Sequence, residues 1–167
     1  MSIPRVDPNR RRGPLGRAYV RFARSPLGRW IGINIATRVD PLLVRLTGGR
    51  VTLGVVLPVA MLTTRGARSG QERVNPIVYF NDGEDIVLIA SSFGRERHPA
   101  WYHNIRAHPE VSLRVGATTG RYTGREVEGD ERDRLWTLAC QVYPGYEDYR
   151  LRASHRRIPV LRLVPGV

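Results

Sequence analysis

The sequence predicts an α+β domain built on a small β-barrel of about six strands, with two helices inserted between the strands. Two observations predict this class. From about residue 51 onward, short segments rich in Val, Ile, Leu and Thr alternate with turn signals. Only two stretches within this part have the spacing of amphipathic helices, so the regular strand and helix alternation of a parallel, doubly wound sheet is absent.

The predicted strands begin after the Gly48-Gly49 pair and are short enough for a small barrel. Between the second and third strands, Asn81-Asp82-Gly83 is a strong hairpin signal, because these residue types tolerate the backbone that tight turns need. The predicted strands cover residues 51–64, 73–80, 85–91, 111–115, 121–128 and 158–164.

Two helices interrupt these strands. The first begins near Pro99, a residue suited to a first helical position, and carries Trp101, Ile105 and His108 on one face. The second begins after Gly129, with Asp130 as its expected N-cap. Its predicted buried stripe consists of Leu135, Leu138, Ala139 and Val142.

The chain before this domain divides into two segments. Residues 1–13 are polar, basic and contain Pro, which predicts a disordered basic tail, and the domain itself is expected over residues 51–167. Residues 14–50 form a basic amphipathic helical arm, in which apolar and aromatic residues alternate with Arg. Such an arm either packs on the domain or lies on an anionic membrane surface, and the sequence leaves both open.

Within the arm, Leu15, Tyr19 and Phe22 follow the spacing of one helical face. Ser25-Pro26 is expected to break this helix. A second helix is predicted from about residue 27 to 37, and a third short piece over residues 42–46.

The chain of 167 residues has a net charge of +12, and all 27 of its basic residues are Arg. This excess implies an anionic partner, which is a cofactor, a nucleic acid or a lipid headgroup. Cys140 is the single cysteine, so an intrachain disulfide is impossible, and its sequence context predicts an inert buried thiol. No segment has the length of a membrane span or the pattern of a secretory signal, so we expect a cytoplasmic protein.

The most informative segment is the predicted turn between the first two strands, over residues 63–76. Its two glycines, Gly66 and Gly70, permit a tight turn with exposed amides. Around them lie Arg65, Arg68, Ser69 and Arg73, which can hold a phosphate. The segment is neither a G-x-G-x-x-G motif nor a P-loop. The alternative is a solvated basic hairpin.

A second segment begins at the end of the third strand, where Ile89 and Ala90 lead into Ser91 and Ser92. Small polar residues at a strand end leave amides and hydroxyls available to the edge of a ligand ring. The following helix offers Trp101 as a flat apolar wall, although a helix cap with a core tryptophan is the simpler interpretation of that residue.

The third segment contains Tyr143, Tyr146 and Tyr149, which lie together if the segment is helical. Pro144 disfavours helix at Tyr143, so the first ring is expected at a helix break. Three clustered tyrosines favour a binding wall over simple packing.

The histidines do not suggest a metal site. His98, His103 and His108 are five residues apart, a spacing that distributes them around a helix. No Ser-His-Asp or Cys-His arrangement stands out either. A cradle without an acid–base pair suits redox chemistry, in which a cofactor carries the difficult step.

These three segments, TTRGARSGQERVNP, SSFGRERHPAWYHN and YPGYEDY, resemble in this order the deazaflavin-dependent nitroreductase family over residues 62–164. The resemblance implies an FMN-binding-like split β-barrel and reduced coenzyme F-420, an 8-hydroxy-5-deazaflavin, as the cofactor. It also implies hydride transfer to an electron-poor acceptor: a quinone, an enone or a nitroaromatic. Some members of the family are membrane-associated quinone reductases, a role that the basic arm would suit.

The resemblance also implies a set of site residues. Ser91 matches a serine near the hydride-transfer site, and Tyr143, Tyr146 and Tyr149 match pocket tyrosines, so these four are the expected catalytic residues. Ser92 and Phe93 depart from the family, where a basic residue and a glycine are expected, and Arg95 or Arg97 could supply the missing charge. The implied cofactor contacts are Ala67, Arg68, Ser69, Arg73, Ile89, Ala90, Ser91, Ser92, Ala100, Trp101, Tyr102, His103, Asn104 and Tyr146.

Two other classes remain open. One is an FMN- or heme-binding split-barrel protein. The other is a basic module that binds membranes or nucleic acid, although the arginines are scattered and stacking aromatics are few, which disfavours nucleic acid.

Overall fold

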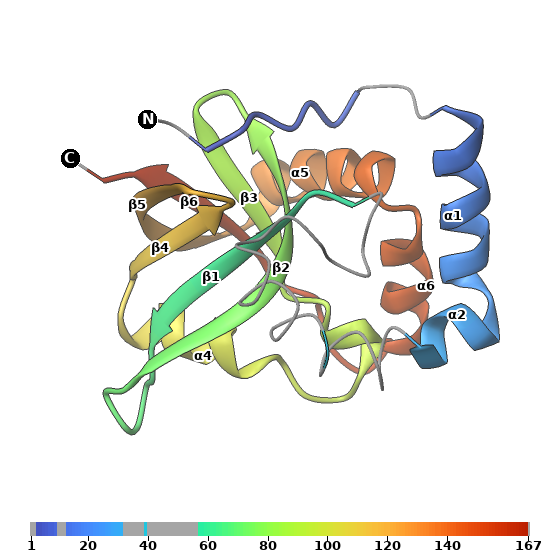
Figure 1. Ribbon diagram of the computed structural model, residues 1–167. Helices are drawn as coiled ribbons and strands as arrows, with labels where there is room; N and C mark the ends of the chain where they lie inside the picture. Colours follow the sequence, from blue (N-terminus) through green and yellow to red (C-terminus); the bar gives the residue numbers. More distant parts are fainter. Residues whose placement is uncertain (1–2, 10–12, 32–38, 40–56, 167) are drawn as a thin grey trace.

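The computed structural model describes residues 3–9, 13–31, 39 and 57–166 and contains the predicted barrel (Figure 1). The strands form one closed, antiparallel barrel in the order β1-β2-β3-β6-β5-β4. The predicted α+β split barrel is therefore confirmed. Its strands are β1 (Val59–Arg65), β2 (Glu72–Asp82), β3 (Asp85–Ile89), β4 (Glu110–Val115), β5 (Thr118–Val127) and β6 (Val160–Pro165).

The predicted hairpin between β2 and β3 is present. Asp82 pairs with Asp85, so the turn consists of Gly83 and Glu84. Gly83 has φ +66°, a left-handed conformation that costs glycine little. The barrel closes where Leu62 of β1 pairs with Leu113 of β4.

Both predicted inserted helices are present. They are α4 (Ala100–Ala107) and α5 (Gly129–Val142), and the tyrosine segment forms a further helix, α6 (Gly145–Arg152). The prediction of Asp130 as N-cap is wrong, because α5 begins two residues earlier with Glu128 at the cap position. Gly129, the first residue of α5, has φ +57°, a left-handed conformation that glycine adopts at little cost. Asp130 lies in the first turn, where its negative charge interacts favourably with the helix dipole.

The strands separate two hydrophobic clusters. Alternate residues of all six strands, such as Leu62, Leu88 and Leu113, fill the barrel interior. The opposite faces of β2, β3, β5 and β6 pack against α5 and α6 in the second cluster. Helix α4 caps the barrel, and its Ile105 approaches β5 so closely that a Cβ added to Gly124 would lie 2.7 Å from the Ile105 side chain.

Residues 3–9, which belong to the predicted disordered tail, contact the barrel. Val6 and Asn81 of β2 exchange two hydrogen bonds, from Val6 N to Asn81 Oδ1 at 2.9 Å and from Asn81 N to Val6 O at 3.0 Å. The Tyr79 hydroxyl donates to the Pro4 carbonyl at 2.9 Å, and Ile3 is only 3% exposed within the barrel core. Composition alone did not reveal these partners, which lie some 75 residues away.

The described part of the arm contains α1 (Pro14–Arg24) and α2 (Pro26–Ile31). The predicted break is confirmed, since Ser25 Oγ donates to Phe22 O at 2.6 Å and accepts from Gly28 N at 3.1 Å. Helix α1 lies beside α6 (Figure 1). Three predicted parts lie outside the described residues: the second helix beyond residue 31, the helical piece over residues 42–46, and residues 51–56 of the predicted first strand.

No helix within the described ranges combines the length and the apolar character that crossing a membrane requires.

Candidate functional site

The β1–β2 hairpin contains the predicted glycine turn. Gly66 N donates to Gln71 O and Gly70 N donates to Gly66 O, each at 2.8 Å. Gly70 has φ +65°, so the turn uses the conformational freedom of that glycine. Residues 67–73 are all exposed.

The arginines of this hairpin have no carboxylate partner among the described residues. Arg65, Arg68 and Arg73 are exposed, and none of them forms an ion pair there. The Arg73 guanidinium donates to the neutral Gln71 side chain at 3.1 Å. Three unneutralised guanidinium groups on one turn favour an anionic ligand.

Asn104 connects this hairpin to α4. Its Oδ1 accepts from Ala67 N at 3.0 Å, and its Nδ2 donates to Thr64 Oγ1 at 3.0 Å. Asn104 is 7% exposed, and its bond to Thr64 is buried, whereas its bond to the amide of the exposed Ala67 is partly buried. The structure therefore brings the first and second predicted segments together, although the Ala67 amide is occupied by Asn104 and is not free for a ligand.

The end of β3 lies between the two hydrophobic clusters. Ile89 belongs to the outer cluster, Ala90 belongs to the barrel core, and the next two residues, Ser91 and Ser92, are half-buried. Within the described part of the chain, the Ser91 hydroxyl has no hydrogen-bond partner. It is therefore free to donate to a ligand.

A strained turn follows, the 3-10 segment η2 (Ser92–Gly94). Ser92 and Phe93 have φ +50° and +57°, a left-handed backbone that costs a non-glycine residue about 1–2 kcal/mol. Phe93 stands where the family pattern has glycine, and the positive φ explains that preference. This turn was not predicted, because the residue types at Ser92 and Phe93 do not favour a left-handed backbone.

The strained turn packs tightly against α6. A Cβ added to Gly94 would lie 2.9 Å from the Tyr149 carbonyl oxygen. The Phe93 ring meets the Tyr149 ring edge-on, with centroids 5.9 Å apart. The second predicted segment therefore also contacts the third.

The three tyrosines form one compact cluster. Tyr143 is the C-cap of α5, with extended backbone as expected beside Pro144, and Tyr146 and Tyr149 lie on α6. Their ring centroids are 5.4 to 6.1 Å apart, and the hydroxyls of Tyr143 and Tyr149 are 3.3 Å apart. Burial raises the pKa of both Tyr146 and Tyr149, so these phenols stay protonated at neutral pH.

Helix α4 carries the remaining predicted contacts. Trp101 is 7% exposed and belongs to the barrel core, whereas the tyrosines belong to the outer cluster, so the structure does not place them together. The Tyr102 hydroxyl donates to Glu126 Oε2 at 2.7 Å. His103 and Ala100 are exposed, and the His103 ring contacts that of Tyr102.

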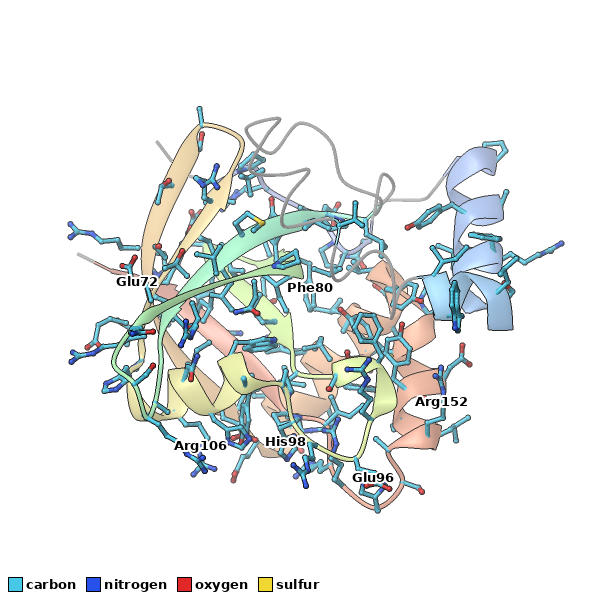
Figure 2. All side chains as sticks on the ribbon, turned by 60° about the horizontal axis from the view of Figure 1, so that its bottom comes forward. Glu72, Phe80, Glu96, His98, Arg106 and Arg152 are labelled. Carbon is cyan, nitrogen blue, oxygen red and sulfur yellow. The ribbon has the colours of Figure 1, made fainter. Side chains whose placement is uncertain are left out.

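Both views show the same order along one side of the molecule. The β1–β2 hairpin with Glu72 lies at one end, α4 with Arg106 in the middle, and α6 with Arg152 at the other end (Figures 1 and 2). His98 and Glu96 lie on the loop that connects η2 (Ser92–Gly94) to α4, and in Figure 2 their labels fall between those of Arg106 and Arg152. The three predicted segments thus form a continuous strip.

Two residues near this strip were missed by the sequence analysis. Glu126 binds Tyr102, and Arg156 donates to the loop that follows β3. Neither belongs to a motif, and each contacts residues far away in the sequence. A single sequence therefore carried no signal for them.

Two further predictions concern titratable groups. Cys140 is half-buried, and burial together with a hydrogen bond to Glu147 raises its pKa to about 12, so its thiol is not activated. Among the residues that the structure describes, His, Cys, Asp and Glu side chains do not gather in a group of three or more that could hold a metal ion.

Comparison with known proteins assigns the family. The sequence model of a family described as F-420H(2)-dependent quinone reductase matches residues 36–165. The chain belongs to this family. Its fold class and its F-420-dependent reductase activity, with reduced F-420 as cofactor, are therefore as the resemblance implied.

Several relatives support this assignment to the quinone reductase family. An F-420H(2)-dependent quinone reductase of Mycobacterium tuberculosis is 33% identical over 142 residues, which are 82% of this chain and 94% of the relative. A Mycobacterium bovis protein with a corresponding description matches equally well.

Two solved structures are also similar to this quinone reductase family member. One is an F-420-H2-dependent reductase with 37% identity and a TM-score of 0.58, covering 64% of this chain and 93% of that one. The other, described as a domain-swapped dimer, has 36% identity and a TM-score of 0.60, covering 75% and 96%.

Replacing Asn104 tests the connection between the hairpin and α4. Asn104→Ala leaves the Ala67 amide and the Thr64 hydroxyl without partners, so we expect the free energy of unfolding to fall by about 1–3 kcal/mol. Urea denaturation followed by tryptophan fluorescence measures it. Gln71→Ala, which removes an exposed amide from the same hairpin, is the control and should change stability by less than about 0.5 kcal/mol. Equal effects would contradict the bridging role.

Proposed function

We propose that this protein transfers a hydride from reduced F-420 to a quinone, with the cofactor along the strip and the acceptor at the tyrosine cluster. The observation that carries the proposal is the continuity of the strip. Asn104 connects the arginine hairpin to α4, and η2 connects the end of β3 to α6. The family description supports both the reductant and the acceptor class.

The hairpin side of the strip suits the anionic part of the cofactor, its phosphate and glutamyl tail. Arg65, Arg68 and Arg73 are exposed and have no carboxylate partner in the described part of the chain, so they bind anions without first breaking an internal ion pair. Ser69 adds a hydroxyl. The donor set therefore fits the group, and residues 89–92 and 100–104 continue from it toward the tyrosines.

When bound, reduced F-420 supplies the hydride. The chain contributes position and polarisation. Among the described residues the Ser91 hydroxyl has no internal partner, and the Tyr143 and Tyr149 hydroxyls share one contact, which leaves one O–H able to donate to an acceptor oxygen. These donors stabilise the negative charge that develops on a quinone oxygen as it receives the hydride. Water or Tyr143 then supplies the proton that completes the hydroquinone.

Enones and nitroaromatics are further proposed acceptors. Each presents an electron-poor centre next to an oxygen that the same donors can polarise.

The arginine cradle is tested by Arg68→Ala. Loss of one charge-assisted contact should weaken F-420 binding by about tenfold, equivalent to ~1.4 kcal/mol, while turnover at saturating cofactor changes little. Quenching of F-420 fluorescence measures the dissociation constant, with FMN titrated in parallel. The matched control is Arg134→Ala. Arg134 lies on α5 and pairs with Asp82, at the end of β2 that is far from the arginine hairpin. Unchanged F-420 affinity in Arg68→Ala would contradict the cradle, and preferential FMN binding would favour the FMN alternative.

The catalytic assignment is tested by Ser91→Ala and Tyr143→Phe. Each removes one donor that acts on the acceptor oxygen, so kcat should fall about tenfold or more while the F-420 dissociation constant stays within about twofold. Steady-state kinetics with menadione measures kcat. Tyr122→Phe is the control, because that tyrosine is buried in the barrel core and should leave kcat unchanged. A kcat loss no greater than in this control would argue against both assignments.

We also propose that the arm binds the inner, anionic surface of the cell membrane, where quinones are dissolved. The side chains of Phe22, Leu27 and Trp30 are 47%, 61% and 57% exposed on α1 and α2. Large exposed apolar side chains on a highly basic chain are typical of peripheral helices that bind anionic lipid. The protein is then cytoplasmic and peripheral.

Co-sedimentation with liposomes tests this arm. The wild type should sediment with phosphatidylglycerol vesicles more than with phosphatidylcholine vesicles, and Leu27→Ser should reduce sedimentation. Leu151→Ser removes a similarly exposed leucine from α6, at 68% exposure, and should have no effect. Equal sedimentation of Leu27→Ser and the wild type would contradict the proposal.

A further inference from the structure

The segment that follows α6 fastens the loop that follows β3. The guanidinium of Arg156 donates to three points of that loop: from Nη2 to Ser91 O at 2.8 Å, from Nε to Arg95 O at 2.9 Å and from Nη1 to His98 Nδ1 at 2.9 Å. The planar fork of an arginine can satisfy three such acceptors at once, which a lysine cannot do.

The charge of Arg156 is unusual in having no acidic partner. The side chain is half-buried, forms no ion pair within the described residues, and has only neutral acceptors. A partly buried guanidinium is ordinarily paired with a carboxylate, because its desolvation is costly.

Arg156 acts directly on the backbone of Ser91. The Ser91 carbonyl accepts from Arg156 and also from Gly94 N at 3.0 Å, so two donors fix the peptide that precedes the left-handed residues Ser92 and Phe93. These bonds compensate for the strain of that turn and hold the Ser91 backbone in one conformation.

The other side of Arg156 leads to the tyrosines. Arg156 N donates to Ala153 O, and Ala153 N donates to Tyr149 O, each at 2.9 Å. Ala153 is fully buried within the tyrosine cluster. One short segment therefore joins Tyr149 to the residue that fixes Ser91.

We propose that Arg156 is a positioning residue that sets the geometry between Ser91 and the tyrosine cluster, and so aligns the cofactor side of the site with the acceptor side. This inference rests on the proposed function, because Ser91 and the tyrosines are assigned there. Arg156 touches neither cofactor nor acceptor in this scheme and acts through the loop.

His98 gives the arrangement a pH-sensitive readout. Its Nδ1 accepts from Arg156, so it must be unprotonated, and a protonated ring would lose this bond. Burial lowers the pKa of His98, and Arg156, His103 and Arg106 lower it further, while Glu126 opposes them. Removing the Arg156 charge should therefore raise the pKa of His98.

The test compares Arg156→Gln and Arg156→Lys with Arg157→Gln. Arg157 is exposed, and its ion pair with Asp133 spans 3.8 Å, so this neighbour is a matched control for charge. With menadione as the acceptor, Arg156→Gln should lower kcat by about tenfold or more while the F-420 dissociation constant stays within about twofold. Arg156→Lys should recover little of this loss, since an ammonium cannot replace the fork.

A second readout needs no cofactor. NMR titration of the His98 ring should give a higher pKa in Arg156→Gln than in the wild type or Arg157→Gln. A kcat equal to that of Arg157→Gln, or an unchanged His98 pKa, would overturn the positioning role. If Arg156→Gln does not fold, His98→Ala, which keeps two of the three bonds, replaces it and should show a smaller loss of kcat. A kcat of His98→Ala equal to that of the wild type would then overturn the proposal. A wild type that binds no F-420 would instead overturn the proposed function, and the His98 titration would still decide whether Arg156 holds the loop.

Discussion

Strand β3 is buried on both faces, with Ile86 and Leu88 in the barrel core and Val87 and Ile89 against α5 and α6, and Ala90, directly after the strand, also lies in the barrel core. The chain that leaves this strand must emerge where the two clusters meet. The positions of Ser91, η2 and α4 follow from this constraint, because the next residues have to connect a barrel interior to an outer helical layer. A one-residue shift in the pairing of β3 would exchange the two faces and separate the end of the strand from both clusters.

The arginines at the two ends of β2 differ in whether they have a carboxylate partner. Around the β2–β3 hairpin, arginines are neutralised, since Arg134 and Arg162 pair with Asp82, and Arg162 also pairs with Asp85. At the opposite end of β2, the arginines of the β1–β2 hairpin have no such partners among the described residues. The hairpin where a cofactor phosphate is proposed to bind therefore offers unpaired guanidinium groups, whereas the arginines beside the β2–β3 hairpin are already paired with carboxylates.

Two sets of contacts hold the parts of the proposed site together. The hairpin is joined to α4 by the buried amide of Asn104, and the loop after β3 is joined to α6 by packing at Gly94 and by the Arg156 guanidinium. Both connections lie at the edges of the barrel, and neither relies on a single long loop. Hydride transfer depends on placing two reacting partners within contact distance, so a scaffold with short connections between the two halves is suited to it.

Local patterns in the sequence predicted the six strands and the two inserted helices, although not the turn η2 or the N-cap of α5. The continuous apolar run of β3, the turn at Gly83 and the break at Pro144 are each determined within a few residues, because they reflect backbone preferences and burial. The predicted stripe of α5 is correct for Leu135, Ala139 and Val142, but Trp136 is buried and Leu138 is only half-buried. Glycines and arginines also marked the hairpin, and the order of three short motifs indicated the family. Only the tertiary structure revealed the left-handed turn at Phe93, the bridge at Asn104, the packing of residues 3–9 on β2 and the contacts of Arg156. The last three of these features join residues some 37 to 75 positions apart, and such contacts depend on barrel closure, which no local preference encodes.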